Sequence, residues 1–151
     1  MYNSVAFQDG ISTVSNRAFG YSKTKEGEYI FNDQSPTSAV LGDGGIYSSA
    51  EDLYLWNESL YTEKLVKFKT LEKAFSLHSQ TSDMDQSGYG YGWYVSSFKN
   101  LLHLWHYGST CGFSTWIDRF PEKKFSIIIL SNQNNDDTIK SISLALRNKL
   151  L

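Results

Sequence analysis

The stretch that decides the fold is Leu101 to Asn132, which reads LLHLWHYGSTCGFSTWIDRFPEKKFSIIILSN. Its first part alternates side chains with the two-residue period of a β-strand, which sends neighbouring side chains to opposite faces of a sheet. Gly108 and Gly112 interrupt this run, and we expect the strand to end in the tetrapeptide His106 to Ser109. That tetrapeptide is the strongest candidate for a functional site in the sequence.

Two further apolar runs follow, Phe113 to Phe120 and Phe125 to Asn132. Between them lie Pro121 to Lys124, and a proline at the first corner with charges behind it is typical of a hairpin connection. The three runs therefore predict consecutive antiparallel strands.

Helical patterns lie on both sides of these strands. A helix is predicted from Ser49 to Tyr61, started by a capping box of Ser48 and Glu51. A shorter helix is predicted from Lys67 to Leu77. A last helix follows the polar residues at Asn134, and its expected apolar stripe consists of Ile139, Ile142, Leu146 and Leu150.

The remaining predicted elements are a loop and short strands. Tyr89 to Val95 alternates as a fourth strand, in which Gly90 and Gly92 leave bare backbone against which another segment can pack. Ser79 to Gly88 is polar and is predicted to be a loop. A charged hairpin is predicted near the start, with strands at Arg17 to Tyr21 and Tyr29 to Asn32. The sum is an α+β fold: an antiparallel sheet of about four to five strands with helices packed against it.

The composition excludes several classes of protein. The 151 residues suit one domain, with 40% hydrophobic and 20% charged residues and a net charge of −2. No Lys/Arg block is present, so nucleic-acid binding is not expected. The longest aliphatic run, Ile127 to Leu130, is far too short to span a membrane. One cysteine, Cys111, excludes an internal disulfide, and the three histidines lack metal-ligand spacing, so neither a metal nor a cofactor is expected.

Aromatic residues are unusually frequent, with ten Tyr, nine Phe and four Trp. Two interpretations remain open. The rings fill the core of a sheet-rich domain, or some of them form a stacking surface for sugars.

Several stretches, in order along the chain, resemble the C-terminal part of the serine β-lactamase and penicillin-binding-protein superfamily, nearest its class C and esterase-like branch. The resemblance covers the chain from about Asn16 onward. It rests on Asn16 to Tyr21, Gly42 to Trp56, Tyr89 to Trp93, His106 to Phe113, Phe120 to Lys124 and Leu130 to Asn132.

This resemblance implies roles for the tetrapeptide. His106, Tyr107 and Gly108 would replace the family's lysine-threonine-glycine element on the strand beside the active site. His106 would polarise the site or hold an acidic substrate group, and Gly108 would keep side-chain bulk away from the reacting carbonyl. The backbone N–H of Ser109 would be one donor of the oxyanion hole. His106, Gly108 and Ser109 are therefore the expected catalytic residues, and Tyr107 and Thr110 the expected substrate contacts.

The catalytic serine of the family lies in an S-x-x-K string at the start of a helix. Two such strings occur here, Ser22 to Lys25 and Ser96 to Lys99, but neither begins a recognisable buried helix. Residues 1–151 are therefore expected to form a single partial domain, a C-terminal segment that is inactive alone. Its expected partners are a separate N-terminal half or further copies of itself. The alternative is a non-catalytic binding module for cell-wall sugars or peptides.

Overall fold

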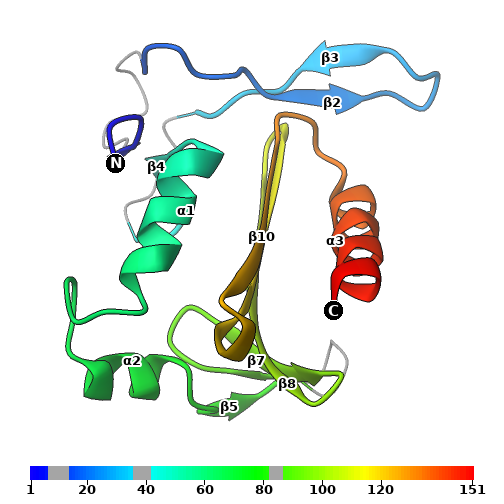
Figure 1. Ribbon diagram of the computed structural model, residues 1–151. Coiled ribbons are helices and arrows are strands. Elements are labelled where there is room, and N and C mark those ends of the chain that lie inside the picture. Colours follow the sequence, from blue (N-terminus) through cyan, green and yellow to red (C-terminus); the bar gives the residue numbers. More distant parts are fainter. Residues whose placement is uncertain (7–13, 36–41, 82–86) are drawn as a thin grey trace.

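A computed structural model describes residues 1–6, 14–35, 42–81 and 87–151 (Figure 1). The fold is α+β, as predicted. Its centre is a six-stranded antiparallel sheet in the order β10-β9-β8-β7-β6-β5, one strand more than the upper end of the prediction. Helices cover both faces of this sheet.

The decisive stretch folds as predicted. It forms β8 (Leu101–Thr110), β9 (Phe113–Phe120) and β10 (Phe125–Ser131), each antiparallel to the next. A short 3₁₀ turn, η1 (Pro121–Lys123), makes the predicted corner between β9 and β10. Gly108 does not end β8, which continues to Thr110 because Gly108 still pairs with Thr115 of β9.

The predicted single strand from Tyr89 to Val95 is wrong. The chain instead forms β5 (Ser79–Gln80), β6 (Gly88–Tyr89) and β7 (Tyr94–Phe98). A tight turn separates β6 from β7, in which the Gly90 N–H donates to the Trp93 carbonyl at 2.8 Å and Gly92 has a φ of +74°. The predicted close packing is real at Gly90, where an added Cβ would lie 2.2 Å from the Ala74 carbonyl oxygen. Part of the predicted 79–88 loop lies outside the described residues.

The three helices are α1 (Ala50–Ser59), α2 (Phe68–Ala74) and α3 (Asp136–Leu150). The N-cap of α1 is Ser49 and not Ser48, because the Ser49 hydroxyl accepts the Asp52 N–H at 3.2 Å. The Ser48 hydroxyl instead bonds the Ser4 hydroxyl at 2.7 Å. Asn135 caps α3 by accepting the Thr138 N–H at 3.2 Å, within the polar run where the start was predicted.

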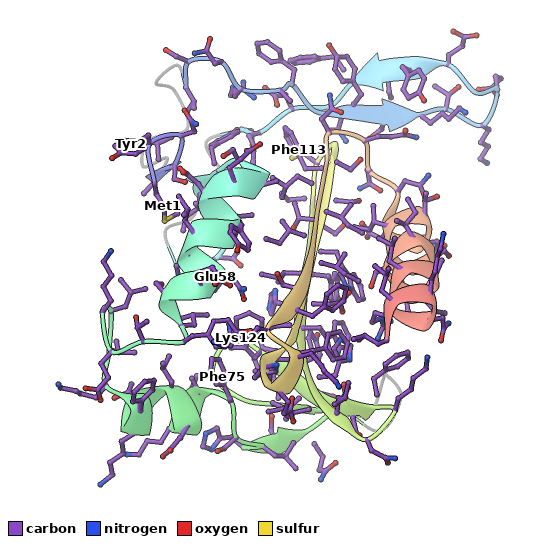
Figure 2. The ribbon with its side chains drawn as sticks, viewed as in Figure 1. Met1, Tyr2, Glu58, Phe75, Phe113 and Lys124 are labelled. Carbon is purple, nitrogen blue, oxygen red and sulfur yellow. The ribbon has the colours of Figure 1, made fainter. Side chains whose placement is uncertain are left out.

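Each face of the sheet has its own core (Figures 1 and 2). The helices α1 and α2 lie on one face, and α3 lies on the other. The first core contains Leu60, Leu71, Trp93 and Leu104, with Trp56 stacked on Trp93 at 5.9 Å. The second contains Trp105, Trp116 and Ile139. All four tryptophans belong to these clusters or pack against them, as the first interpretation of the composition expected. Other aromatic side chains are exposed: Tyr2, Phe19, Tyr29, Phe31, Tyr54, Phe68 and Tyr91.

The predicted apolar stripe of α3 is mostly wrong. The residues buried by α3 are Ile139, Ser143 and Arg147, spaced four apart. Ile142, Leu146 and Leu150 are exposed instead. The helix turns its polar side inward because the sheet offers it buried polar partners, Asp118 of β9 and His103 of β8.

Arg119 of β9 joins the sheet to the end of α1. Its side chain is only 1% exposed, and its guanidinium donates to the Asn57 carbonyl at 3.0 Å and to the Asn57 side chain at 2.8 Å. The guanidinium lies 3.9 Å from the centroid of the Tyr61 ring. The negative end of the helix dipole and the ring face both stabilise this buried cation, although burial lowers the pKa of Arg119.

A hairpin of β2 (Tyr21–Lys23) and β3 (Tyr29–Phe31) crosses the end of the large sheet. β3 lies within its predicted range, whereas β2 begins where the predicted strand ends. A second small pair, β1 (Val5–Ala6) with β4 (Ile46–Tyr47), lies near α1. The hairpin contacts the β8–β9 turn through backbone: the Gly112 N–H donates to the Asn32 carbonyl at 2.7 Å. Phe113, labelled in Figure 2, lies directly beneath this crossing.

Candidate active site

The second half of β8 differs from the first in its strand partners. Residues Leu101 to Trp105 pair with β7 on one edge, and the last pair is Tyr94 with Trp105. From His106 to Thr110 the strand pairs with β9 only, on its other edge. Among the described residues no strand pairs with the outer edge of this segment. The predicted site residues therefore lie along an open strand edge.

His106 lies at the point where this open edge begins. Its ring is half-buried, and its Nε2 atom is 2.9 Å from the hydroxyl of Tyr89 on β6. Burial lowers the pKa of His106 below its ordinary 6.5, and a backbone hydrogen bond with Tyr107 offsets part of this effect. Burial also raises the pKa of the Tyr89 hydroxyl. At neutral pH the pair is thus an uncharged imidazole bonded to an uncharged phenol.

Other rings surround this pair. The ring of Tyr94 lies 4.8 Å from that of Tyr89 and 5.8 Å from that of His106. The ring of Tyr107 lies 6.0 Å from that of Tyr94. The His106 ring therefore lies against a group of aromatic rings at the start of the open edge.

The register of the strand sets the direction of the Ser109 backbone groups. A two-residue turn, Cys111 and Gly112, joins the paired residues Thr110 and Phe113. In such hairpins the residue pair next to the turn is hydrogen-bonded, and non-hydrogen-bonded and hydrogen-bonded pairs then alternate along the two strands. Tyr107 and Ser109 belong to non-hydrogen-bonded pairs, so their backbone N–H and C=O groups point away from β9, toward the open edge. Ser109 is also exposed.

The five predicted site residues divide between the two faces of the sheet. His106, Gly108 and Thr110 share the face that α1 and α2 cover, whereas the side chains of Tyr107 and Ser109 point to the face of α3. An added Cβ at Gly108 would lie 2.6 Å from Oγ1 of Thr115. Packing against Thr115 is therefore one reason why this position lacks a side chain.

The end of the open edge is fixed in place by the hairpin above it. An added Cβ at Gly112 would lie 2.2 Å from the Tyr21 amide nitrogen, and one at Gly20 would lie 2.6 Å from the Asn32 carbonyl oxygen. Two backbones can cross this closely only where both lack side chains. An ion pair between Arg17 and Asp33 holds the base of the hairpin and lowers the pKa of Asp33.

The two S-x-x-K serines lie in strands and not at helix starts. The Ser22 hydroxyl in β2 accepts a hydrogen bond from the Asn32 side-chain amide at 2.8 Å. The Ser96 hydroxyl in β7 lies 3.1 Å from Nδ1 of His103. Neither hydroxyl has a lysine partner among the described hydrogen bonds.

Sequence reasoning missed the buried polar cluster around His103. His103 is 3% exposed, and its Nε2 atom lies 2.6 Å from Oδ1 of Asp118. The Ser143 hydroxyl donates to the other oxygen of Asp118, and the Arg147 guanidinium lies 3.4 Å from Nδ1 of His103. The alternation of side chains along β8 places His103 on the face of α3, but no local sequence pattern indicates its contact with Asp118.

This cluster resembles a serine–histidine–carboxylate array, but it is built as an anchor. The His103 ring is stacked on Phe120 at 4.7 Å and shares Nδ1 between Ser96 and Arg147. Every member is held by neighbours on β7, β8, β9 or α3. The cluster fixes α3 to the sheet behind the candidate site.

Within the described ranges, no three His, Cys, Asp or Glu side chains lie together in a way that could bind a metal ion. No helix in the same ranges is long and apolar enough to cross a membrane.

The chain is thus an antiparallel sheet between two helical layers, with His106 and Gly108 at an open strand edge, and its family follows from comparison with known proteins. A profile of the Beta-lactamase family matches residues 3–147. The chain therefore belongs to the Beta-lactamase family. Over 132 residues it is 25% identical to Penicillin-binding protein 4* of Bacillus subtilis (strain 168), a match that covers 82% of this chain and 29% of that protein.

Solved structures of penicillin-binding proteins and of an amidohydrolase have a similar fold. An octameric penicillin-binding protein homologue from Pyrococcus abyssi superposes with a TM-score of 0.81 at 26% identity, over 99% of this chain and 34% of that one. A penicillin-binding protein from Bacillus halodurans gives a TM-score of 0.76 at 20% identity, over 96% and 44%. A D-stereospecific amidohydrolase from Streptomyces gives 0.74 at 17%, over 93% and 42%. The chain thus spans less than half the length of each of these proteins.

Proposed function

We propose that this chain supplies one wall of the active site of a serine acyl-transfer hydrolase of the β-lactamase and penicillin-binding-protein type. The substrate class would be an amide, an ester or a β-lactam. The observation that carries the proposal is the open edge of β8, where the His106 ring and the Ser109 backbone N–H lie within one short segment. Family membership supports this chemistry in general terms.

In this proposal each residue of the segment has a defined role. A serine outside this chain attacks the substrate carbonyl carbon, and its Oγ forms the new C–O bond and gives up its proton. The C–N or C–O bond of the substrate then breaks, and its nitrogen or oxygen takes up that proton. The Ser109 N–H stabilises the negative oxygen of the tetrahedral intermediate. His106, neutral because burial lowers its pKa, acts by hydrogen bonding and not by charge. Tyr107 and Thr110 contact the rest of the substrate, and water then hydrolyses the acyl-enzyme.

The nucleophile is the missing part of this site. Ser22 has an amide partner, and Ser96 is tied to the anchor cluster, so neither has a base free to activate it. We therefore propose that residues 1–151 act as a partial domain that is inactive alone. A polypeptide with the S-x-x-K and Y-x-N elements would complete the site, and association with further copies of the chain is the second route to a larger assembly.

The experiment is an intact-mass measurement after incubation with a fluorophosphonate or with a penicillin. The chain alone is expected to give no adduct while circular dichroism confirms that it is folded. A mixture with a polypeptide that carries the two missing elements is expected to give one adduct on that polypeptide, and His106→Gln in this chain is expected to reduce its rate. A stoichiometric adduct on a serine of this chain alone would overturn the proposal.

The second candidate is a non-catalytic binding module for cell-wall sugars or peptides. The observation that favours it is the group of rings at the start of the open edge, Tyr89, Tyr94 and Tyr107, beside His106. Aromatic faces stack on sugar rings, and an open strand edge binds extended peptides. Saturable binding of peptidoglycan fragments without turnover, lost in Tyr89→Ala, would favour this module over the hydrolase.

A further inference from the structure

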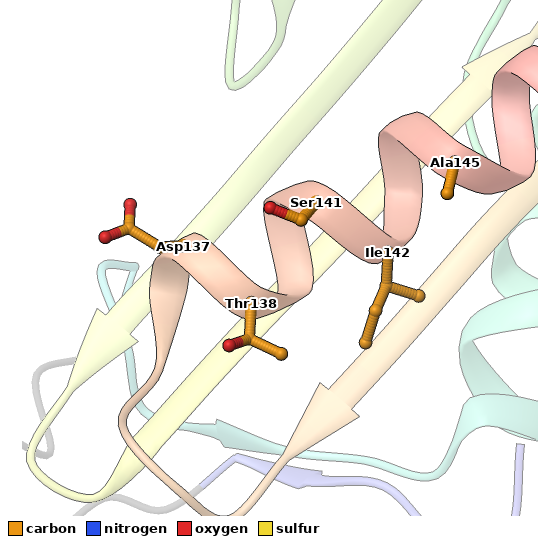
Figure 3. Close-up of a pocket in the computed structure, with 5 residues that line it drawn as sticks. All are labelled: Asp137, Thr138, Ser141, Ile142 and Ala145. Atoms are coloured by element: carbon orange, nitrogen blue, oxygen red, sulfur yellow. The ribbon is translucent and has the colours of Figure 1, made fainter.

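The surface hollow on α3 and the open edge of β8 differ in their titratable groups. Five residues line the hollow, a space of about 380 Å³ (Figure 3): Asp137, Thr138, Ser141, Ile142 and Ala145. Asp137 is the one titratable side chain in this lining. The open edge instead begins with two titratable side chains in direct contact, since the Tyr89 hydroxyl lies 2.9 Å from Nε2 of His106. This bonded pair is therefore the feature that can fix the position of a proton.

Tyr89 and His106 belong to strands that are not neighbours in the sheet. The order β8-β7-β6 places β7 between them, and two strand spacings amount to about 10 Å. The contact is possible because β7 begins only at Tyr94, which pairs with Tyr89 on one side and with Trp105 on the other. The Tyr89 ring packs against the ring of Tyr94 at 4.8 Å and reaches the next residue of β8, which is His106.

The backbone on both sides of Tyr89 is held by close packing. A Cβ added at Gly88 would lie 2.8 Å from the Ser79 carbonyl oxygen of β5. One added at Gly90 would lie 2.2 Å from the carbonyl oxygen of Ala74, the last residue of α2. Tyr89 is therefore the one side chain of a three-residue segment that lies tightly against β5 and α2. A residue that orients another needs such a support.

The directions of the hydrogen bonds follow from the second bond of the imidazole. Burial lowers the pKa of His106, and a bond with the backbone of Tyr107 acts in the opposite direction. A backbone bond raises the pKa of an imidazole when a ring N–H donates to a carbonyl oxygen, because the charged ring keeps that bond. A neutral imidazole has a single N–H. Since Nε2 faces the Tyr89 hydroxyl, this N–H is on Nδ1, and the Tyr89 O–H is the donor to Nε2.

From this geometry we infer that Tyr89 is a positioning residue for His106, because its hydroxyl donates to Nε2 and holds the ring as the neutral Nδ1–H tautomer. The bond made by one ring nitrogen of a histidine determines the state of the other. Loss of the Tyr89 hydroxyl leaves the ring on its single bond to the Tyr107 backbone, about which it can turn. The role of this positioning in acyl transfer rests on the proposed function, whereas the tautomer depends on this chain alone.

The first experiment is nitrogen NMR of the imidazole rings in the folded chain at neutral pH. The chain has three histidines, so the signals of His106 are those that His106→Gln removes. They are expected to show a protonated Nδ1 and an unprotonated Nε2. In Tyr89→Phe, which removes only the hydroxyl, the Nε2 signal is expected to move toward that of an unbonded ring nitrogen. Tyr91→Phe is the matched control and is expected to leave it unchanged, since Tyr91 is 61% exposed and stacks on His78 at 4.3 Å.

The second experiment measures the rate of adduct formation in the mixture with the polypeptide that carries the S-x-x-K and Y-x-N elements. Tyr89→Phe is expected to lower this rate about tenfold, the effect of one lost hydrogen bond. In a chain that already contains His106→Gln, the same change is expected to have no further effect, because Tyr89 acts through His106. A hydroxyl with a purely structural role would lower the rate in both backgrounds.

Three results would overturn the inference. The first is a proton on Nε2 of His106 in the unchanged chain. The second is an Nε2 signal that Tyr89→Phe leaves as unchanged as Tyr91→Phe does. The third is a pair of rate effects, from Tyr89→Phe and His106→Gln, that multiply in the double variant. If no mixture forms an adduct, the hydrolase proposal fails, and the two NMR results still decide whether Tyr89 positions His106.

Discussion

The two halves of β8 have the same secondary structure but different surroundings. Leu101 to Trp105 pairs with β7, and its last two residues also pair with β9, whereas His106 to Thr110 pairs with β9 only. Each half contains a histidine. His103 is fixed in a buried cluster with Asp118, and His106 is half-buried beside Tyr89. The difference teaches that the β7–β8 pairing, which ends at the pair Tyr94 and Trp105, decides which histidine lies beside an open strand edge.

The largest expected effect comes from breaking the anchored half. Asp118→Ala is expected to lower the free energy of unfolding by about 3–5 kcal/mol, because it leaves His103, Ser143 and Arg147 buried without their acceptor. Urea denaturation measures this loss. His106→Ala, in the other half, is the comparison and is expected to cost only about 1 kcal/mol. Equal losses in the two variants would contradict the division of β8 into an anchored and an open half.

The next effect tests how the end of the open half is fixed. Gly112→Ala is expected to cost about 2–4 kcal/mol, because its Cβ would lie 2.2 Å from the Tyr21 backbone and 2.5 Å from that of Asn32. Thermal unfolding measures it. Gly92→Ala is the control: Gly92 also has special backbone geometry, with a φ of +74°, but nothing lies within 4 Å of its added Cβ. A cost no greater than that of the control would show that the hairpin crossing is not tight.

A smaller effect is expected within the open half itself. Gly108→Ala is expected to cost about 1–2 kcal/mol, because its Cβ would meet only the Thr115 hydroxyl. Adding Thr115→Ala removes that clash, so a double-mutant cycle should give a favourable coupling. Additive costs would mean that Gly108 is required by the backbone and not by Thr115.

The dependence of stability on pH provides a further test of the comparison. The pKa of folded His106 is below the 6.5 of the unfolded chain, so the unfolded state takes up its proton first as the pH falls. The contribution of His106 is therefore fully present above about pH 6.5 and is lost as the pH falls toward the folded pKa. His106→Gln should remove this slope in urea titrations between neutral and mildly acidic pH.

Two carboxyl groups act in a separate pH window. The pKa of Asp33 and that of Asp52 are both below 3.8. For Asp52 burial alone would raise the pKa, but hydrogen bonds from Ser4 and from the backbone of Asn3 and Tyr2 outweigh it. Their contributions are lost only as the pH falls below about 4. If the free energy of unfolding of His106→Gln still depends on pH near neutrality, the pH dependence does not come from His106.

The smallest expected effect lies at the turn that ends β8. Cys111 has a φ of +48°, a conformation that costs a residue with a side chain more than it costs glycine. Cys111→Gly is expected to stabilise the chain by about 0.5 kcal/mol, since the relief of strain exceeds the added entropy of the unfolded glycine. Lys124→Gly, at a φ of +47° in the β9–β10 turn, is expected to stabilise the chain in the same way. A loss of stability in both variants would contradict this.

The sequence by itself determined the local order of this protein. The alternation from Leu101 to Asn132 predicted three antiparallel strands, and Pro121 predicted their corner, because strand periodicity and turn chemistry depend on neighbours in sequence. The ordered motifs predicted the family, and the family profile matches. The roles of His106, Tyr107, Gly108, Ser109 and Thr110 stay predictions.

Only the tertiary structure decided where β7 ends along β8, which side of α3 is buried, and which histidine is anchored. Ile142 and Leu146 read as a core stripe, yet Ser143 and Arg147 are inside because Asp118 and His103 lie opposite them. A local sequence pattern shows how apolar a helix face is, but not which side chains the facing strand presents to that face. Burial of a polar side chain depends on a hydrogen-bond partner from a distant part of the chain, and such a partner leaves no periodic trace in the sequence.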